Sequence, residues 1–521
     1  MDNSQNNKRI IKNTLMLYVR MLFSMFVSFY TSRVILDVLG ITDFGINNVV
    51  AGVAGMFTFI NTSLAGATSR FLTFDLGLND MEKLKKTFSA ALTVHIVLAF
   101  VIFVLCETIG VWILETKLVI PENRMFAARI IFQLSVLSCM LMITQVPYNA
   151  VLIAHERMDV YAYFGIADVF LKLGIVFLLQ WMPFDKLITY GVLFFILSGG
   201  MMMAYRYYGT KHFEECRWRI TSDKKLLKPL LLFSGCDVYG NMCVMFRGQG
   251  INILQNMFWG PAINAATGVS QQILNAILGF SRNFTTAIQP QIVKFYAQEN
   301  YQQIQLLATR CAKFSFFLLF VISFPALLKV NFVMNIWLKE VPDYAFVFCQ
   351  LAIVVNWFDL LNTPLNMIIH ATGKMKRISF ITGSIILFTL PLTYLFLKMG
   401  YSPTTPFWVN IFITIVAGLH NLYLVKLYIP EFKAMKFLQQ GVLYPLGVVS
   451  IGAIIPILVN YSTVSFNSIY SFFIVCFSCV ICELLSIFYL GLNAHEKIKM
   501  TDSFPKKHIP VAATNAVRFI I

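Results

Sequence analysis

Long apolar stretches alternate with short polar ones along the whole chain. A helix needs about 20 apolar residues to cross a bilayer, and stretches of this length recur from the first residues to the last third of the sequence. They predict fourteen transmembrane helices, at 13–37, 44–67, 88–114, 127–153, 160–182, 187–207, 229–256, 262–287, 308–333, 344–369, 377–398, 405–428, 437–460 and 466–490. The connections are short and none resembles a soluble catalytic domain. We therefore expect an all-α integral membrane protein.

One segment of this pattern occurs twice, 217 positions apart. Gln145–Met158 and Asn362–Met375 are both apolar helices that contain a proline and end near a basic residue, and the shift places Pro147 on Pro364. A repeat at this distance indicates two related halves. Six helices fall in each half, and because six is even the halves share one orientation. The predicted architecture is two pseudo-symmetric six-helix lobes plus an extra helix pair.

The predicted organisation follows from these spans. It comprises a cytoplasmic N-terminus 1–12, a first lobe 13–208, a cytoplasmic inter-lobe loop 209–228, a second lobe 229–428, the helix pair 437–490 and a basic tail 491–521. Pro147 and Pro364 interrupt their helices and free backbone carbonyls, for which Asn149 and Asn366 are candidate local partners. Each proline is either a flex point for movement of its lobe or a fixed kink, and the sequence supports both readings.

Composition agrees with a membrane location. Only 13% of residues are charged and 58% are hydrophobic, whereas soluble domains carry about 25% charged residues. The net charge is +16, but the basic residues lie between apolar segments rather than on one polar face, which argues against a nucleic-acid partner. Most of them fall in one set of connections. The opposite set holds only Lys117, Arg124, Arg129, Lys186, Lys329, Lys339 and Lys398. The positive-inside rule therefore predicts that both termini are cytoplasmic.

Five basic residues fall within predicted spans: Arg20, Arg33, Lys172, Arg247 and Arg282. A charge at membrane depth costs from about 2.5 kcal/mol upward, so each should face a cavity, a partner or the interface. The arginines fit a cationic cavity for an anionic substrate, because a guanidinium matches phosphate oxygens. The alternative is that they extend to the membrane surface.

The acids are less informative. Asp168 precedes Lys172 by four residues, the favourable order for an ion pair within one helix, so this pair is better explained as structural than as a binding site. Asp237 is near Arg247 on the seventh predicted helix. Either acid is a candidate for proton or sodium coupling, and no acid is assigned that role.

Uncharged polar residues concentrate on the second and eighth predicted helices. Gln271, Asn275 and Arg282 follow i, i+4, i+11 and predict one stripe facing water, and Asn48 on the second helix is a further cavity candidate. The alternative is hydrogen bonding between helices, worth about 0.6 kcal/mol on average.

Several stretches resemble bacterial polysaccharide exporters, the O-antigen and capsule flippases of the multidrug/oligosaccharidyl-lipid/polysaccharide (MATE-like) superfamily. They are Asn13–Met21, Tyr30–Leu36, Asp43–Ile46, Gly66–Leu72, Val146–Asn149 and Ala154–Tyr161. The resemblance implies two lobes around a central cavity in the bacterial inner membrane, with no cofactor. It also implies transport of undecaprenyl-pyrophosphate-linked oligosaccharide to the periplasmic leaflet by alternating access. Polysaccharide-assembly enzymes are candidate partners, and the sequence leaves contact with them open. In such proteins cationic cavity residues are thought to contact the carrier lipid or the sugar, here Arg20, Arg33, Arg247 and Arg282 by position.

Three alternatives remain from sequence. A MATE-type drug/cation antiporter would need an acidic cavity, whereas the charges within these spans are mostly basic. A membrane O-antigen polymerase or ligase would need a large outer loop, whereas the predicted outer connections are short. A non-transporting scaffold explains neither the repeat nor the arginines.

Overall fold

The computed structural model describes residues 3–56, 68–69, 71–73, 75–76, 80–155, 157–217, 224–463, 468–493 and 496–497. Those residues form helices and short connections, without a strand. Eleven of the described helices are long and apolar enough to cross a membrane. Two more, α8 (Lys224–Trp259) and α9 (Pro261–Ala297), have the length but are more polar. Because α1 (Asn3–Gly55) also has two arms, the described helices are compatible with fourteen crossings.

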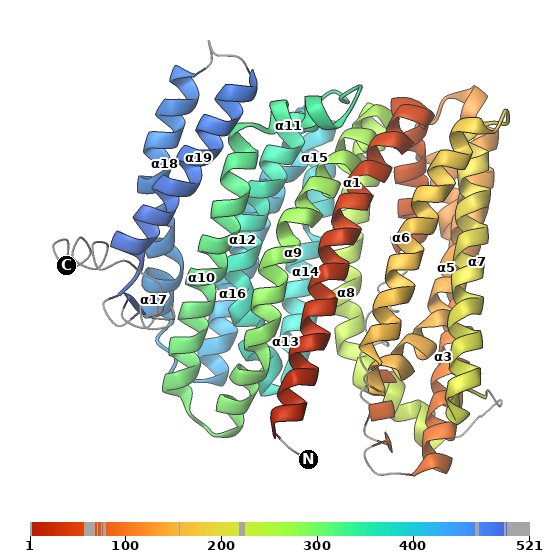
Figure 1. Ribbon diagram of the computed structural model, residues 1–521, viewed down its shortest axis with the longest axis horizontal. Helices are drawn as coiled ribbons and strands as arrows, with labels where there is room; N and C mark the ends of the chain where they lie inside the picture. The colour runs from red at the N-terminus through yellow and green to blue at the C-terminus, as the bar shows by residue number, and fades with distance from the viewer. Residues whose placement is uncertain are drawn as a thin grey trace.

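The first group of helices occupies the right side of Figure 1. It consists of α1, α3 (Met81–Leu105) continued by η2 (Cys106–Gly110) and α4 (Val111–Thr116), η3 (Glu122–Arg124), α5 (Met125–Ala154), α6 (Met158–Trp181), α7 (Lys186–His212) and η4 (Glu214–Cys216). Here α5 packs on α3 and α7, and α1 packs on α5 and α6. This is the first lobe.

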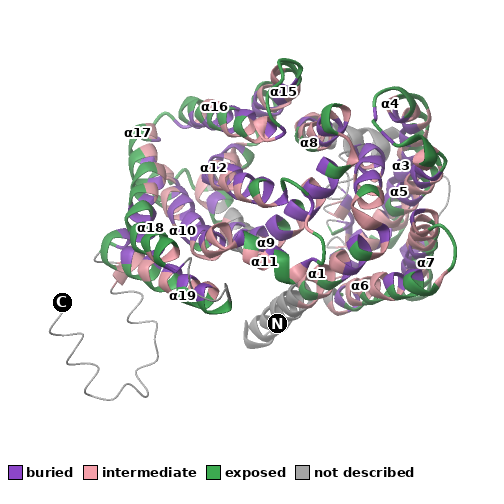
Figure 2. Ribbon diagram, turned by 90° about the horizontal axis from the view of Figure 1, so that it is seen from above, coloured by how far each residue is buried: buried purple, intermediate pink, exposed green. Residues whose placement is uncertain are grey.

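The second group lies in the middle of the same view. It consists of α8, α9, α10 (Tyr301–Leu328), α11 (Val330–Trp337), α12 (Ala345–Thr372), α13 (Met375–Arg377), η5 (Ile378–Thr382), α14 (Gly383–Leu387), α15 (Thr389–Lys398) and α16 (Thr405–Tyr428). Its centre is α12, which packs on α9, α10 and α16. Figure 2, seen from above, shows the same order of helices across the molecule.

A further pair stands at the left edge of Figure 1. It is formed by α17 (Ala434–Phe437), η6 (Leu438–Leu443), α18 (Tyr444–Ser462), α19 (Ser468–Ser486) and η7 (Ile487–Gly491). The pair packs on α10 and presents large apolar side chains outward, such as Leu458, Phe473 and Phe477, which are more than 60% exposed. This surface suits contact with lipid chains.

The predicted helices 13–37 and 44–67 correspond to the two arms of α1, which are separated by non-helical backbone at Gly40; positions 57–67 of the second predicted helix lie outside the described residues. Gly40 has φ 75° and ψ 169°, a conformation open to glycine and strained for residues with a Cβ atom. Pro147 and Pro364 lie inside α5 and α12, and both are buried. Asn366 is bonded outside its own helix, since its Oδ1 accepts a hydrogen bond from Asn421 on α16.

The lobes are joined near Gly40, at what we call the Gly40 end. A buried amide cluster connects α1 to α8 and α9: Asn252 Nδ2 donates to Asn48 Oδ1 at 3.0 Å, and Asn264 Nδ2 donates to Asn252 Oδ1 at 2.6 Å. Asn256 Nδ2 donates to Asn264 Oδ1, and the Val119 N–H donates to Asn256 Oδ1 at 2.7 Å. Asn252, Asn256 and Asn264 are at most 5% exposed, so these bonds are shielded from water.

Contacts of α1 with α11 and with the residues that follow α11 lie at the same end. Lys339 Nζ lies 2.5 Å from Asp37 Oδ2, and the indole N–H of Trp337 donates to the Phe29 carbonyl at 2.7 Å. Arg33 donates to the Ile336 carbonyl at 3.4 Å. In the described part of the chain, the Gly40 end therefore carries polar bonds that hold the two lobes together.

One buried acid lies away from the lobe contact. Glu483 on α19 is 0% exposed, and neither carboxylate oxygen has a hydrogen-bond partner among the described residues. A Cβ atom on Gly452 would lie 2.7 Å from Glu483 Oε2, so glycine provides the space for this carboxyl group.

We expect Glu483→Met to stabilise the protein by about 1–3 kcal/mol, because it removes an unpartnered buried polar group at similar volume. Thermal unfolding in detergent measures the change. The control is Glu340→Met, at an exposed acid, with a shift near zero. A lower melting temperature for Glu483→Met would show that the carboxyl group has a stabilising partner.

Candidate functional site

A polar cavity lies between the lobes, against the arm of α1 that precedes Gly40. It has a volume of about 380 Å³ and is lined by α1 and α9. The polar lining residues are Ser24, Ser28, Gln272 and Asn275. A neighbouring cavity of about 260 Å³ shares Ser28 and Gln272 and extends to α6 and α7. We call these two adjoining spaces the central cavity.

Among the described residues that line the central cavity, one is basic. Lys172 on α6 lines its wall, with Nζ 2.7 Å from Asp168 Oδ2 and 5.7 Å from the ring centre of Phe194. The ion pair has the i, i+4 geometry that the sequence suggests, and Lys172 also reaches the cavity. Asp168 itself is not part of the lining. The described residues that line the cavity include no Asp or Glu.

An unsatisfied hydroxyl lies in the same wall. Thr31 lines the cavity and is 9% exposed, and its Oγ1 has no hydrogen-bond partner among the described residues. Buried hydroxyls are normally hydrogen-bonded, so an exception beside a cavity marks a position where a ligand can bind. The central cavity therefore combines hydroxyls, amides and one lysine with the aromatic rings of Tyr190 and Phe194.

The structure separates the residues that the sequence grouped. Asn275 lines the central cavity and Gln271 is exposed, whereas Asn48 belongs to the buried amide cluster. Arg33 is directed toward α11 at the Gly40 end. The side chains of Arg20, Asp237 and Arg282 lie outside the described part of the structure.

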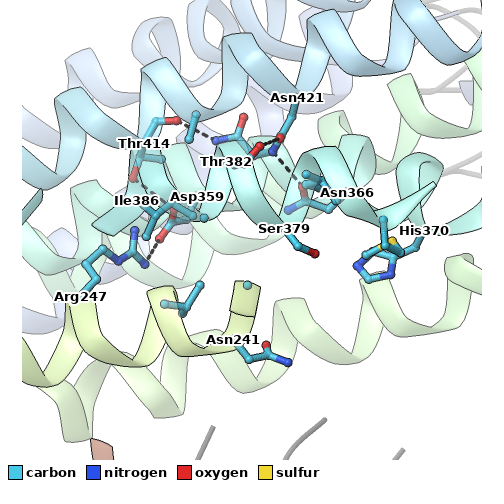
Figure 3. A pocket seen from close by; sticks show the side chains of 17 residues that line it. Asn241, Arg247, Asp359, Asn366, His370, Ser379, Thr382, Ile386, Thr414 and Asn421 are labelled. Carbon is cyan, nitrogen blue, oxygen red and sulfur yellow. Dashed lines mark hydrogen bonds and ion pairs between the residues drawn. The ribbon is translucent and has the colours of Figure 1, made fainter. Parts of the chain in front are cut away.

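Arg247 lies in a different cavity, inside the second lobe, with a volume of about 420 Å³. We call it the second-lobe pocket. Arg247 Nη2 lies 3.7 Å from Asp359 Oδ2, and Arg247 Nη1 donates to Asn410 Oδ1 at 3.1 Å. Figure 3 shows Arg247 and His370 at opposite ends of the pocket. Its lining shares no residue with the central cavity.

Sequence reasoning missed most of this pocket. Asp359, Asn362, Asn366 and His370 are spaced i, i+3, i+7, i+11 on α12 and all line it. Such spacing places polar side chains on one face of an otherwise apolar helix. The same periodicity test that singled out Gln271 and Asn275 would have found this stripe.

Two sequence comparisons, with models of protein families and with curated proteins, found no match. Solved structures do match. The lipid II flippase MurJ in an inward closed conformation has a TM-score of 0.63 and 14% identity, covering 92% of this chain and 99% of that chain. An inward-facing multidrug resistance MATE family transporter of the MOP superfamily has a TM-score of 0.60 and 12% identity, covering 79% of this chain and 96% of that chain.

A third match is a MOP superfamily transporter from Pyrococcus furiosus, described by the reverse polarity of its binding pocket. It has a TM-score of 0.57 and 12% identity, covering 81% of this chain and 96% of that chain. At these identities the similarity establishes the fold. The chain is a multi-pass membrane protein with the fold of MOP-superfamily transporters.

Proposed function

We propose that this protein is a lipid-linked oligosaccharide flippase of the bacterial inner membrane. It moves undecaprenyl-pyrophosphate-linked repeat units from the cytoplasmic to the periplasmic leaflet, for O-antigen, capsule or exopolysaccharide synthesis, by alternating access of its two lobes. Both termini are cytoplasmic in this proposal, so the Gly40 end faces the periplasm. Polysaccharide-assembly enzymes supply and consume its substrate.

The lining of the central cavity carries this proposal. Serine, threonine and amide side chains can replace the water that hydrates sugar hydroxyls, and Lys172 offers a positive charge to a phosphate or an acidic sugar. A site for cationic drugs would instead need an acid in the wall, and among the described residues that line the cavity there is Lys172 but no Asp or Glu. Arg20 and Arg282 are further candidates for contact with the carrier pyrophosphate.

The extent of the structural match adds support. The MurJ structure, titled as a lipid II flippase, covers 92% of this chain, whereas the multidrug transporter covers 79%. The difference is comparable in length to the segment that contains α18 and α19.

Deletion of the gene tests the function. We expect lipid-linked repeat units to accumulate in the cytoplasmic leaflet, measured as units that an external glycosidase cannot reach in intact spheroplasts. Accumulation in the outer leaflet would indicate a polymerase or ligase, and unchanged polysaccharide with lost efflux of cationic dyes would indicate a drug antiporter. Either result would overturn the proposal.

Substitution of Lys172 tests the site. We expect Lys172→Met to lower surface polysaccharide about tenfold at equal protein abundance, the effect of losing roughly 1.4 kcal/mol of substrate interaction. Since Asp168 then loses its partner, the double variant Asp168→Asn/Lys172→Met is made alongside and should restore abundance without restoring transport. The control is Lys398→Met, at an exposed lysine on α15. Normal polymer in the double variant would reduce the pair to a structural role.

A further inference from the structure

The second-lobe pocket is a polar cavity to which the proposal above, based on the central cavity, assigns no role. Its walls come from α8, α12, α16 and the segment η5–α14. Its volume of about 420 Å³ falls within the range of small-ligand sites, about 300–1,000 Å³.

The fold does not require this polarity. The 217-residue repeat places Asp359, Asn362, Asn366 and His370 of α12 on the α5 residues Met142, Gln145, Asn149 and Ile153. Met142 and Ile153 are apolar and exposed, at 55% and 37%. In the first lobe, α5 thus has apolar residues where α12 has Asp359 and His370. Binding of a ligand explains these two polar side chains on α12 better than helix packing does.

The wall opposite α12 includes a π-helix. η5 winds with i→i+5 hydrogen bonds, and such segments are frequent at functional sites. It presents Ser379 and Thr382 to the pocket. Ser379 is 5% exposed and lines the pocket, where its hydroxyl can donate to or accept from a ligand.

A chain of hydrogen bonds fixes the amides. Thr382 Oγ1 donates to Asn421 Oδ1 at 2.7 Å, and Asn421 Nδ2 donates to Asn366 Oδ1 at 2.9 Å. Because the carbonyl oxygen of Asn366 is engaged in this way, its two amide N–H groups remain for a ligand. Figure 3 shows Thr382, Asn421 and Asn366 in this sequence along the pocket.

The charges of the pocket nearly cancel. Arg247 and Asp359 face each other at 3.7 Å, and Asn410 accepts one further hydrogen bond from Arg247. A paired guanidinium and carboxylate do not favour a strongly charged ligand. They do offer planar donors and acceptors that can each engage two neighbouring hydroxyl groups.

We infer that the second-lobe pocket is a glycan subsite that binds one neutral, hydroxyl-rich sugar of the transported oligosaccharide. Arg247, Asp359, Asn366 and Ser379 supply its hydrogen bonds. The inference rests on the proposed function and adds the lobe and the residues through which the protein distinguishes one repeat unit from another.

Filling the pocket provides the test. Gly240 lines the pocket, and a Cβ atom there would meet Ser379 atoms at 3.6–3.8 Å, which is ordinary contact, so Gly240→Leu adds a side chain to the pocket with no backbone collision at its Cβ atom. Gly248 lies two turns further along α8 with nothing within 4 Å of its Cβ position. Gly248→Leu is therefore a matched control with the same change in helix propensity. Ser379→Ala removes one hydroxyl only.

The probe is the soluble oligosaccharide repeat unit released from the surface polysaccharide of the source strain, titrated into purified protein in detergent by calorimetry. We expect Gly240→Leu to weaken binding at least about tenfold and Ser379→Ala about threefold to tenfold, with Gly248→Leu unchanged. Thr31→Val, in the central cavity, is titrated in parallel.

The outcomes separate the two proposals. Weaker binding by Thr31→Val with unchanged binding by Gly240→Leu and Ser379→Ala would overturn the glycan subsite and leave the flippase proposal standing. No binding by the unmodified protein would count against both. A sodium titration is run on the same proteins. If Gly240→Leu abolished sodium binding and left oligosaccharide binding intact, the pocket would be a cation site and the inference would be wrong.

Discussion

Gly45→Ala is expected to force the lobes apart at the Gly40 end and to abolish most transport. Gly45 on α1 is buried against α9, where an added Cβ atom would lie 1.9 Å from the Pro261 carbonyl oxygen and 2.7 Å from its carbonyl carbon. These are backbone atoms, so a side-chain rotation cannot relieve the collision. Overpacking of this kind costs about 1–3 kcal/mol or more.

Thiol cross-linking measures the separation of the lobes. Asp37→Cys and Lys339→Cys replace a lobe-to-lobe ion pair of 2.5 Å, and the yield with a short bifunctional thiol reagent should fall severalfold in the Gly45→Ala background. Gly55→Ala on the same helix is the matched control, because no described residue lies within 4 Å of its Cβ position. Full cross-linking together with normal transport in Gly45→Ala would show that α1 and α9 tolerate the added methyl group.

Arg124→Met is expected to give the largest loss of stability from a single charge. Arg124 donates to Asp43 Oδ1 at 2.8 Å and to Asp185 Oδ2 at 2.6 Å, so it holds the second arm of α1 to the start of α7. Breaking a buried ion pair costs about 3–5 kcal/mol. Because Asp185 is 34% exposed, we expect roughly 2–3 kcal/mol here.

The loss should depend on pH. Partial burial acts to raise the pKa of Asp185, but the hydrogen bonds from Arg124 and from the Ile188 N–H outweigh it and hold this pKa below its usual value. A carboxyl group with a depressed pKa stabilises the fold above its unfolded pKa of about 4, and this stabilisation is lost as pH falls through the folded pKa. The gap in melting temperature between the native chain and Arg124→Met should therefore be widest near pH 7 and narrow below about pH 4.

Melting curves across this pH range, with Arg129→Met as control, check the prediction. Arg129 pairs with Glu115 at 2.6 Å but is 57% exposed, so its loss should cost no more than about 1 kcal/mol. Equal losses for the two variants at pH 7 would contradict the role assigned to Arg124.

The fold was predictable because two strong signals agree. The apolar stretches predict most of the membrane-spanning helices. The 217-residue repeat predicts two lobes independently of where each helix begins and ends. The break between 13–37 and 44–67 was predicted, but the conformation of Gly40 within it was not. A glycine in the sequence does not reveal whether its φ is positive.

The site was predictable only in part, because polarity alone does not show what lies opposite a side chain. Asn264 and Asn275 are both amides on α9, yet Asn264 is fully buried against Asn252 and Asn256 while Asn275 lines the central cavity. The difference comes from the position of α8 and α1 relative to α9, and these are long-range contacts. The stripe on α12 was visible in the sequence, but Asn366 was attributed to the neighbouring proline.

The position of Gly40 also fixes the relative lengths of the two arms of α1 that lead to the central cavity and to the amide cluster. Ser28 in the central cavity is twelve residues before Gly40 and Asn48 in the amide cluster is eight residues after it, which correspond to helical arms of about 18 Å and 12 Å. If α1 rotates about the bend as one rigid body, a displacement at Asn48 is accompanied by one about 1.5 times larger at Ser28. A small opening between α1 and α8 would thus widen or narrow the substrate cavity by more than the contact itself moves.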